Sequence, residues 1–216
     1  MTQIKLIVVG LIATFTSSAL AANASAAEWH VNGTPLATTV GLSTTTKVEQ
    51  SLVLTVPSLP LTLSCASLSG VKPELVAKAS GRASELVFGG CKVTTGPPGC
   101  ELVPNAKGKI LTEPVEALLA LGSKAPDDKV TIKPQKSKNV FAEVPFNMEC
   151  GSLSNTQIID GKIVSDAPTG QTELVEQPLV GLGTKEPTGL TVSGVAAYLS
   201  GQANVKLVSG LKWSFK

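Results

Sequence analysis

The sequence predicts an all-β fold, an antiparallel β-sandwich or barrel stabilised by two disulfide bonds. Three observations support this fold class: apolar residues alternate with polar ones in several short segments, turn-forming residues separate those segments, and an even number of cysteines follows an export signal. With 216 residues, the chain has room for one domain of this class or two small ones. Its 20 Gly and 14 Pro stay below the share typical of low-complexity chains, so a packed core is feasible.

Residues 1–27 are predicted to be a secretory signal peptide. Lys5 supplies the positive charge near the start, residues 6–20 are largely apolar, and small residues follow. The apolar stretch has the length of a signal core and is short for a membrane-spanning helix. We expect cleavage between Ala21 and Ala27, which leaves residues 28–216 as a single secreted β-rich domain. The protein is then secreted or held in the periplasm or cell envelope, with no transmembrane segment after signal removal.

All four cysteines lie in the exported part of the chain, where disulfide bonds persist. The turn-forming segment 94–99 (TTGPPG) favours a hairpin that returns Cys100 to Cys91. Of the three possible pairings, we therefore expect Cys91 with Cys100 and Cys65 with Cys150. A zinc site made by the four sulfurs is disfavoured, because the chain has no Cys-x-x-Cys pair.

Strands are expected wherever apolar residues recur at every second position. In chain order these residues are Leu52, Leu54 and Val56; Leu61, Leu63 and Cys65; Leu86 and Phe88; the even positions of 140–150; Val195, Ala197 and Leu199; and Leu211, Trp213 and Phe215. Turn residues lie between them at 57–58, 89–90, 127–128, 168–170 and 187–189. Short strands with such turns are typical of antiparallel sandwiches and barrels.

The clearest alternation runs over residues 140–150, with Val140, Val144 and Phe146 among the apolar positions. Pro145 lacks the N–H that a central strand donates, so this strand should lie at a sheet edge or carry a bulge there. Trp213 and Phe215, also at period two, should project on one face into the core. The alternative is a terminal strand that adds to the sheet of another subunit.

One segment fits two structures. Residues 114–121 begin with proline and precede Gly122, as a short helix does, yet their apolar residues also alternate. A domain joint is conceivable at 122–138, where polar residues accumulate. A Cys65–Cys150 bridge would span that joint, which favours a single unit.

Composition and charge exclude several classes of function. The chain has 18 basic and 16 acidic residues and no basic run, so neither nucleic acid nor an anionic membrane is an expected partner. His30 is the only histidine, which excludes multi-histidine metal sites. Because it lies near the expected mature N-terminus, we expect His30 to have a surface or strand-pairing role. The adjacent acids Asp127 and Asp128 are expected to form a solvated turn, and we predict no metal, cofactor or catalytic residue.

An alternative function is a carbohydrate-binding or carbohydrate-active module. Such a site needs two carboxylates beside an aromatic surface. The candidate acids are Glu143, Glu149, Asp160, Glu173 and Glu176, and the candidate rings are Trp29 and Tyr198. With eight aromatic residues in the whole chain, the supply of stacking surfaces is small.

A set of short phrases is spread over the mature chain. They are EWHVNG at 28–33, FGGC at 88–91, PGC at 98–100, TEP at 112–114, PTGQTE at 168–173, AYLSG at 197–201 and SGLKWSF at 209–215. In this order the phrases resemble a family of secreted bacterial proteins with no established activity. The resemblance implies an exported β-rich domain with paired cysteines, and it carries over no ligand or catalytic residue.

These observations together predict an exported, non-enzymatic protein of the envelope or extracellular space with a structural or interaction role. Its partner is unknown from the sequence, and an envelope component or a second copy of the chain are the candidates.

Overall fold

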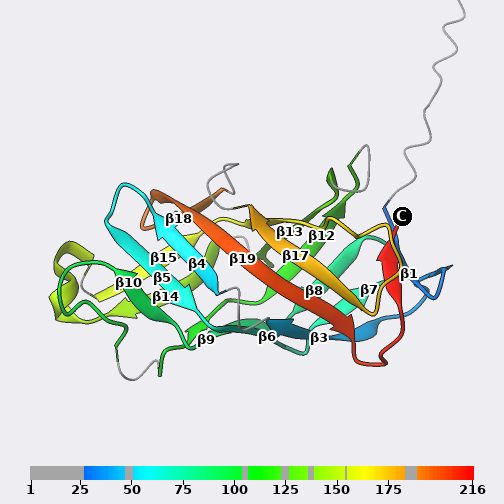
Figure 1. The fold of residues 1–216 in the computed structure, drawn as a ribbon, viewed down its shortest axis with the longest axis horizontal. Helices are drawn as coiled ribbons and strands as arrows, with labels where there is room; N and C mark the ends of the chain where they lie inside the picture. The colour runs from blue at the N-terminus through cyan, green and yellow to red at the C-terminus, as the bar shows by residue number, and fades with distance from the viewer. Residues whose placement is uncertain are drawn as a thin grey trace, which may run out of the picture.

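The computed structural model describes residues 27–46, 51–103, 107–122, 127–135, 139–153, 155–182 and 189–216. The predicted signal peptide therefore lies outside the described residues except for Ala27. Figure 1 shows an elongated body made almost entirely of strands, and the all-β prediction is confirmed. Among the described residues, no helix is long and apolar enough to cross a membrane.

The strands follow one another with short connections. They are β1 (Trp29–Val31), β2 (Thr34–Pro35), β3 (Val40–Thr46), β4 (Leu52–Val56), β5 (Leu61–Cys65), β6 (Ser67–Val71), β7 (Glu74–Val76), β8 (Ser80–Ala83), β9 (Glu85–Gly89), β10 (Lys92–Thr95), β11 (Ile110–Leu111), β12 (Val115–Ala120), β13 (Lys129–Pro134), β14 (Val140–Phe146), β15 (Asn155–Asp160), β16 (Ile163–Asp166), β17 (Glu176–Leu182), β18 (Leu190–Val192), β19 (Val195–Leu207) and β20 (Trp213–Phe215). A short 3-10 helix, η3 (Met148–Leu153), follows β14.

Eight of the strands form a closed antiparallel barrel. The order is β3-β7-β8-β12-β13-β16-β17-β19, and β19 pairs again with β3. The closing ladder joins Ala203–Leu207 of β19 to Leu42–Thr46 of β3. Since each barrel strand has a neighbour on both sides, closure removes the free edges that an open sheet would expose.

Strand β19 also belongs to a second sheet, with the order β10-β5-β4-β19-β18-β15-β14. Figure 1 shows β19 running obliquely across the body from this sheet to the barrel. Its neighbour changes from β4 to β3 around Gly201, which has φ +112°. A Cβ at Gly201 would lie 2.6 Å from the carbonyl oxygen of Ser51, so only glycine allows this close passage.

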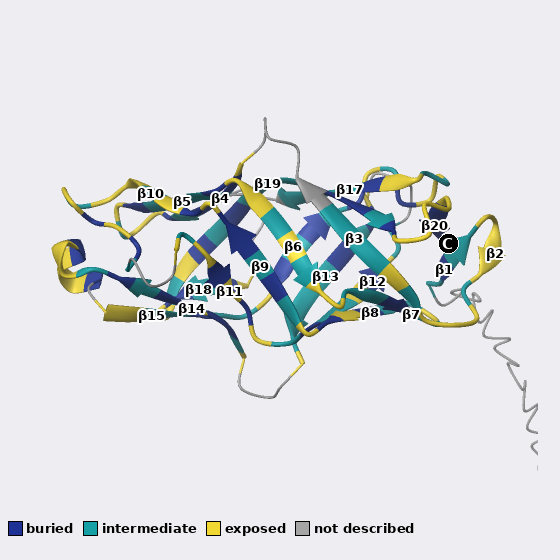
Figure 2. Ribbon diagram, turned by 90° about the horizontal axis from the view of Figure 1, so that it is seen from below, coloured by how far each residue is buried: buried dark blue, intermediate teal, exposed yellow. Residues whose placement is uncertain are grey.

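A three-stranded sheet, β11-β9-β6, completes the lobe built on the second sheet. Thr112 bridges to Ala142, and the Glu113 N–H donates to the Phe141 carbonyl at 2.9 Å, which joins this sheet to β14. Buried residues form one core cluster in this lobe and a second cluster at the far end of the barrel. In Figure 2 the buried segments run through the middle of the body and exposed segments lie around it.

The second three-stranded sheet, β2-β1-β20, lies at one end of the barrel (Figure 2). Trp29 packs on Trp213 and Phe215, with ring centroids 5.9 and 5.6 Å apart. Trp213 and Phe215 are buried, as predicted. Strand β20 pairs with β1 of its own chain, so the alternative of adding this terminal strand to another subunit is not the arrangement seen.

The segment 114–121, for which the sequence allows a helix or a strand, contains the strand β12 (Val115–Ala120) and no helix. Strand β12 pairs along its whole length with β13 (Lys129–Pro134), which lies within the polar segment 122–138, so β12 and β13 belong to the same barrel wall on either side of the conceivable joint. Strand β14 pairs along its length with one strand, β15, but isolated bridges from Leu102 and Thr112 reach its other side and the Pro145 carbonyl accepts from the Val103 N–H at 2.9 Å, so the edge position predicted for Pro145 is only partly seen. The irregularity in that ladder lies between Val140 and Ala142 and not at Pro145.

Both disulfide bonds exist, but the predicted pairing of Cys91 with Cys100 and Cys65 with Cys150 is wrong. Cys65 is bonded to Cys91 and Cys100 to Cys150. The antiparallel ladder of β6 and β9 pairs Ser67 with Gly89 and so brings the residues just outside both strands together. The two Cα atoms of Cys65 and Cys91 lie 3.9 Å apart. Because β10 continues from Cys91 along β5, the turn at 96–99 does not return the chain to Cys91.

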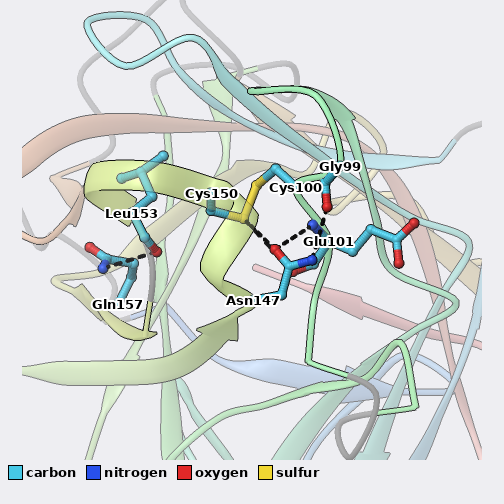
Figure 3. The surroundings of a disulfide bond; sticks show 7 residues. All are labelled: Gly99, Cys100, Glu101, Asn147, Cys150, Leu153 and Gln157. Carbon is cyan, nitrogen blue, oxygen red and sulfur yellow. Dashed lines mark hydrogen bonds between the residues drawn. A yellow bond between two sulfur atoms is a disulfide. The ribbon is translucent and has the colours of Figure 1, made fainter.

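The Cys100–Cys150 bond depends on a second long-range contact (Figure 3). The side chain of Asn147 donates to the Gly99 carbonyl at 2.9 Å and accepts from the Glu101 N–H at 3.2 Å. The Asn147 N–H in turn donates to the Glu101 carbonyl at 3.0 Å. These bonds hold the segment that contains Cys100 beside the start of η3, where Cys150 lies.

Candidate functional site

The barrel interior contains a cavity of about 120 Å³, and every one of the eight barrel strands contributes to its lining. Alternate residues of each strand face inward, as the pleat requires, for example Val130 and Ile132 on β13. Eight strands give an interior that side chains can just fill or that holds one small ligand.

Small residues at inward positions explain why the side chains leave this space. Gly81 and Ala83 on β8, Ala117 on β12, Gly181 on β17 and Ala203 on β19 all line the cavity. A Cβ on Gly81 would be 3.2 Å from the Glu74 carbonyl oxygen and 3.4 Å from the Cβ of Ala117, so glycine here also allows a close approach of β7. The three alanines come from three strands, so the deficit of side-chain volume is spread around the barrel wall, whereas a Cβ on Gly181 would lie 2.7 Å from the Leu199 carbonyl oxygen.

Large side chains line the cavity at both ends. Trp29 and Trp213 line it on the side of the β1-β20 plug. Leu52, Phe88 and Leu199 line it on the side of the second lobe, where they belong to the other core cluster. The cavity therefore lies where the two cores meet.

An apolar space of this volume is costly when empty. At about 24 cal/mol per Å³, a cavity of this size disfavours the folded state by about 3 kcal/mol relative to a packed interior. Water is a poor occupant, since a buried water needs two to four polar partners. An apolar guest of matching size would restore the missing dispersion contacts.

Besides the two tryptophans, the polar and charged residues of the lining are Thr44, Ser165, Glu74 and Arg82. The Thr44 hydroxyl donates to the Leu68 carbonyl at 2.9 Å, and the Trp29 indole N–H donates to the Ser80 carbonyl at 2.7 Å. The indole N–H of Trp213 is buried and has no acceptor among the described residues.

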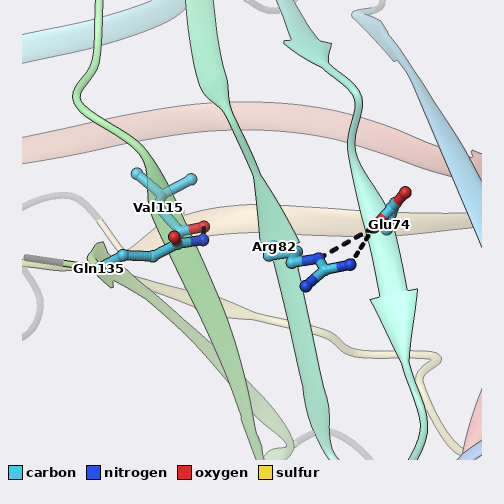
Figure 4. Close-up of polar contacts among 4 residues, drawn as sticks. All are labelled: Glu74, Arg82, Val115 and Gln135. Atoms are coloured by element: carbon cyan, nitrogen blue, oxygen red, sulfur yellow. Dashed lines mark hydrogen bonds and ion pairs between the residues drawn. The ribbon is translucent and has the colours of Figure 1, made fainter. Parts of the chain in front are cut away.

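Two charged residues of the barrel strands, Glu74 and Arg82, are among the residues that line the cavity, and their side chains are paired with each other and partly exposed. Figure 4 shows Arg82 on β8 paired with Glu74 on β7, with 2.9 Å between Nη2 and Oε2, and 57% and 32% of the two side chains exposed. Gln135 donates to the Val115 carbonyl at 2.7 Å on the neighbouring strand. The paired head groups are thus partly in contact with solvent, although both residues also belong to the cavity wall.

A second hollow, a more open and polar groove of about 660 Å³, lies between β9, β11 and β14. Glu85, Glu113 and Glu143 line it together with Lys107 and Lys109. Its lining residues include no aromatic side chain, so the groove does not combine paired acids with a stacking surface.

The other candidates for a carbohydrate site are dispersed. Glu176 lies on the barrel wall, 3.8 Å from the Lys206 amino group. Trp29 is buried in the plug and lines the inner cavity, and Tyr198 lies on β19 opposite Thr55. In the described part of the chain, neither ring lies in the groove that holds Glu143.

His30 has the strand-pairing role that the sequence predicts. It lies in β1, opposite Ser214 and Pro35, with Nδ1 3.3 Å from the Gly33 carbonyl oxygen. Across the described ranges, no group of three or more metal-ligating residues comes together. Asp128 departs from its prediction, because its side chain is fully buried and not part of a solvated turn.

No protein-family model, curated protein or solved structure matches this chain. The resemblance to a family of secreted bacterial proteins therefore stays a prediction. Sequence reasoning missed the cavity, and the available signal was the run of Gly and Ala at positions that alternate within strands.

Proposed function

We propose that the protein is an exported, non-enzymatic binding protein whose barrel interior holds a small apolar molecule. The observation that carries this proposal is the cavity of about 120 Å³ lined by all eight barrel strands. It is somewhat smaller than an apolar protein cavity of about 150 Å³ that binds benzene. The expected guest is therefore a single small ring or a short aliphatic chain.

Export is supported by the predicted signal peptide at 1–27 and by the two disulfide bonds. Disulfides persist outside the cytosol, so the bonds are compatible with an extracellular or periplasmic protein. We place the protein in the periplasm, the cell envelope or the medium, where it would take up its ligand by an interaction and not by a reaction. Retention as an envelope component or association with a second copy are compatible with this role.

Titration with benzene tests the binding function. We expect saturable binding by calorimetry and a melting temperature that rises with benzene concentration, since a ligand that binds only the folded state stabilises it. Replacing Ala203, which is buried on β19 and lines the cavity, by leucine should weaken benzene binding at least about tenfold by occupying the space.

Ala196→Leu is the matched control, because Ala196 lies on the same strand but is exposed and outside the cavity lining. This variant should bind benzene within about twofold of the natural protein. Absence of saturable binding, or equal affinities in the two variants, would rule out the barrel interior as a ligand site.

A further inference from the structure

Resting on the proposed function, we infer that the ligand enters and leaves the barrel interior between β3 and β6, at a seam that the hydrogen bond from the Thr44 hydroxyl to the Leu68 carbonyl holds closed. The seam is formed by Leu42 and Thr44 on one side and by Leu68 and Pro73 on the other, and all four residues line the cavity.

The first observation is that one edge of β3 has no strand paired with it beyond its first two residues. The ladder of β3 with β7 has two residue pairs and ends at Gly41, whereas its ladder with β19 continues to Thr46. Strand β6 lies beside the remaining edge (Figure 2). In the ranges that the structure describes, no strand pairing and no backbone hydrogen bond joins β3 to β6.

The bonds that cross the seam are few. The Leu42 N–H donates to the Pro73 carbonyl at 2.7 Å near the end of β6, and the Thr44 hydroxyl donates to the Leu68 carbonyl at 2.9 Å. The second bond breaks by rotation of one side chain, without displacement of either strand. Local opening is easiest where few hydrogen bonds and contacts must be lost together, so the seam opens more readily than a continuous ladder.

The seam also leads directly to the cavity. Its four residues line the cavity and are half-buried, so each is in contact with the solvent as well. The lining residues of β19, which are Leu199, Ala203 and Val205, are buried by comparison. An opening of the seam therefore connects the barrel interior with the solvent without displacing β19.

The join between β16 and β17 is the alternative route, because its ladder also has two residue pairs. Gln177 of β17 is fully buried there, and its side-chain amide donates to the carbonyls of Thr172 and Trp213 at 2.7 Å each. The oxygen of the same amide accepts from the Thr169 hydroxyl at 3.1 Å. Opening this join would leave a buried amide unpaired, which is costly, so we assign the route to the seam.

The experiment compares two threonine-to-valine variants. Thr44→Val removes the hydroxyl at the seam, and Thr169→Val is the matched control, because it removes one hydroxyl hydrogen bond at the alternative route and lies outside the cavity lining. Benzene association and dissociation rates are measured by NMR exchange spectroscopy, the affinity by calorimetry, and the melting temperature of each variant is recorded.

In Thr44→Val, both rates should increase about 3- to 10-fold, the worth of one neutral hydrogen bond that is lost only in the open state. Because the two rates increase together, the affinity should change less than either of them. In Thr169→Val, both rates should stay within about twofold of those of the natural protein. A comparable decrease in melting temperature in the two variants would show that global stability does not explain the difference.

The two proposals fail in different ways. If benzene does not bind the natural protein, the barrel has no ligand function and both proposals fall. If benzene binds but Thr44→Val leaves its exchange rates unchanged, or if Thr169→Val accelerates exchange as much, the binding function stands and the assigned route does not.

Discussion

Single residues decide what the interior of this barrel can contain. Inward positions that hold Val, Ile or Leu in a packed barrel hold Gly or Ala at Gly81, Ala83, Ala117 and Ala203. Loss of a few methyl groups from a core leaves space that the backbone cannot collapse to fill, because strands in a closed barrel are fixed by neighbours on both sides. The identity of these residues, more than the fold itself, creates the candidate site.

Asp128 is a buried polar residue whose hydrogen bonds stabilise the fold. It is fully buried, and its Oδ1 accepts from the Gly122 N–H at 2.9 Å and from the Gln171 amide at 3.0 Å. Asp128→Ala leaves these donors without an acceptor, so the free energy of unfolding in urea should fall by about 2–3 kcal/mol. Asp127→Ala, at the neighbouring exposed position, should change it by less than about 0.5 kcal/mol. If the two substitutions lowered the free energy of unfolding equally, the hydrogen bonds accepted by Asp128 would not contribute to stability.

At the scale of elements, β19 connects the two lobes because it changes partners along its length. The first half pairs with β18 and β4, the second half pairs with β3, and β17 accompanies it on the other side over Ser200–Lys206. One strand thus supplies side chains to both core clusters, among them Leu199 and Val205. A substitution at Gly201, where β19 changes its partner from β4 to β3, should therefore destabilise both lobes.

Gly201→Ala tests that point. The substitution places a Cβ 2.6 Å from the Ser51 carbonyl oxygen at a φ of +112°, which L-residues rarely adopt. We expect a loss of about 2–4 kcal/mol in unfolding free energy, measured by urea denaturation, from backbone strain and overpacking. Gly41→Ala on β3 is the control, because its Cβ would meet Val208 at 3.4 Å with an ordinary φ. If both variants unfold at the same urea concentration, the change of partner does not require glycine.

At the scale of the whole molecule, the two disulfide bonds constrain separate parts of the chain. Cys65 and Cys91 are 26 residues apart, and Cys100 and Cys150 are 50 apart, so the closed loops do not overlap. On the chain-entropy model, they destabilise the unfolded state by about 3.5 and about 4 kcal/mol. The covalent restraint lies in the lobe of the second sheet, since all four cysteines belong to its core cluster.

Removing either bond should lower the melting temperature. For Cys65→Ser with Cys91→Ser, and for Cys100→Ser with Cys150→Ser, we expect decreases of about 5–15 °C by calorimetry, and reduction of the natural protein should cause a larger one. Peptide mapping of the unreduced protein should yield fragments that link 65 to 91 and 100 to 150. An unchanged melting temperature with four free thiols before reduction would contradict the assignment.

Residue patterns alone determined part of the local structure of this protein. Alternation at 52–56, 61–65, 140–146 and 195–199 corresponds to β4, β5, β14 and the first part of β19, because the period of a strand's side chains is a property of the local backbone. The even number of cysteines predicted two bonds, and Trp213 and Phe215 were assigned to the core by the same period.

Only the tertiary structure decided which cysteines pair, that β3 and β19 close a barrel, and that a cavity lies inside it. Each depends on the register between strands far apart in the chain: Ser67 opposite Gly89 determines the Cys65–Cys91 bond, and Ala203 opposite Thr46 begins the ladder that closes the barrel. Local alternation says which residues share a face, but it does not say which strand lies beside which. The volume left between eight inward faces is a sum over such pairings, so it exists only once all of them are made.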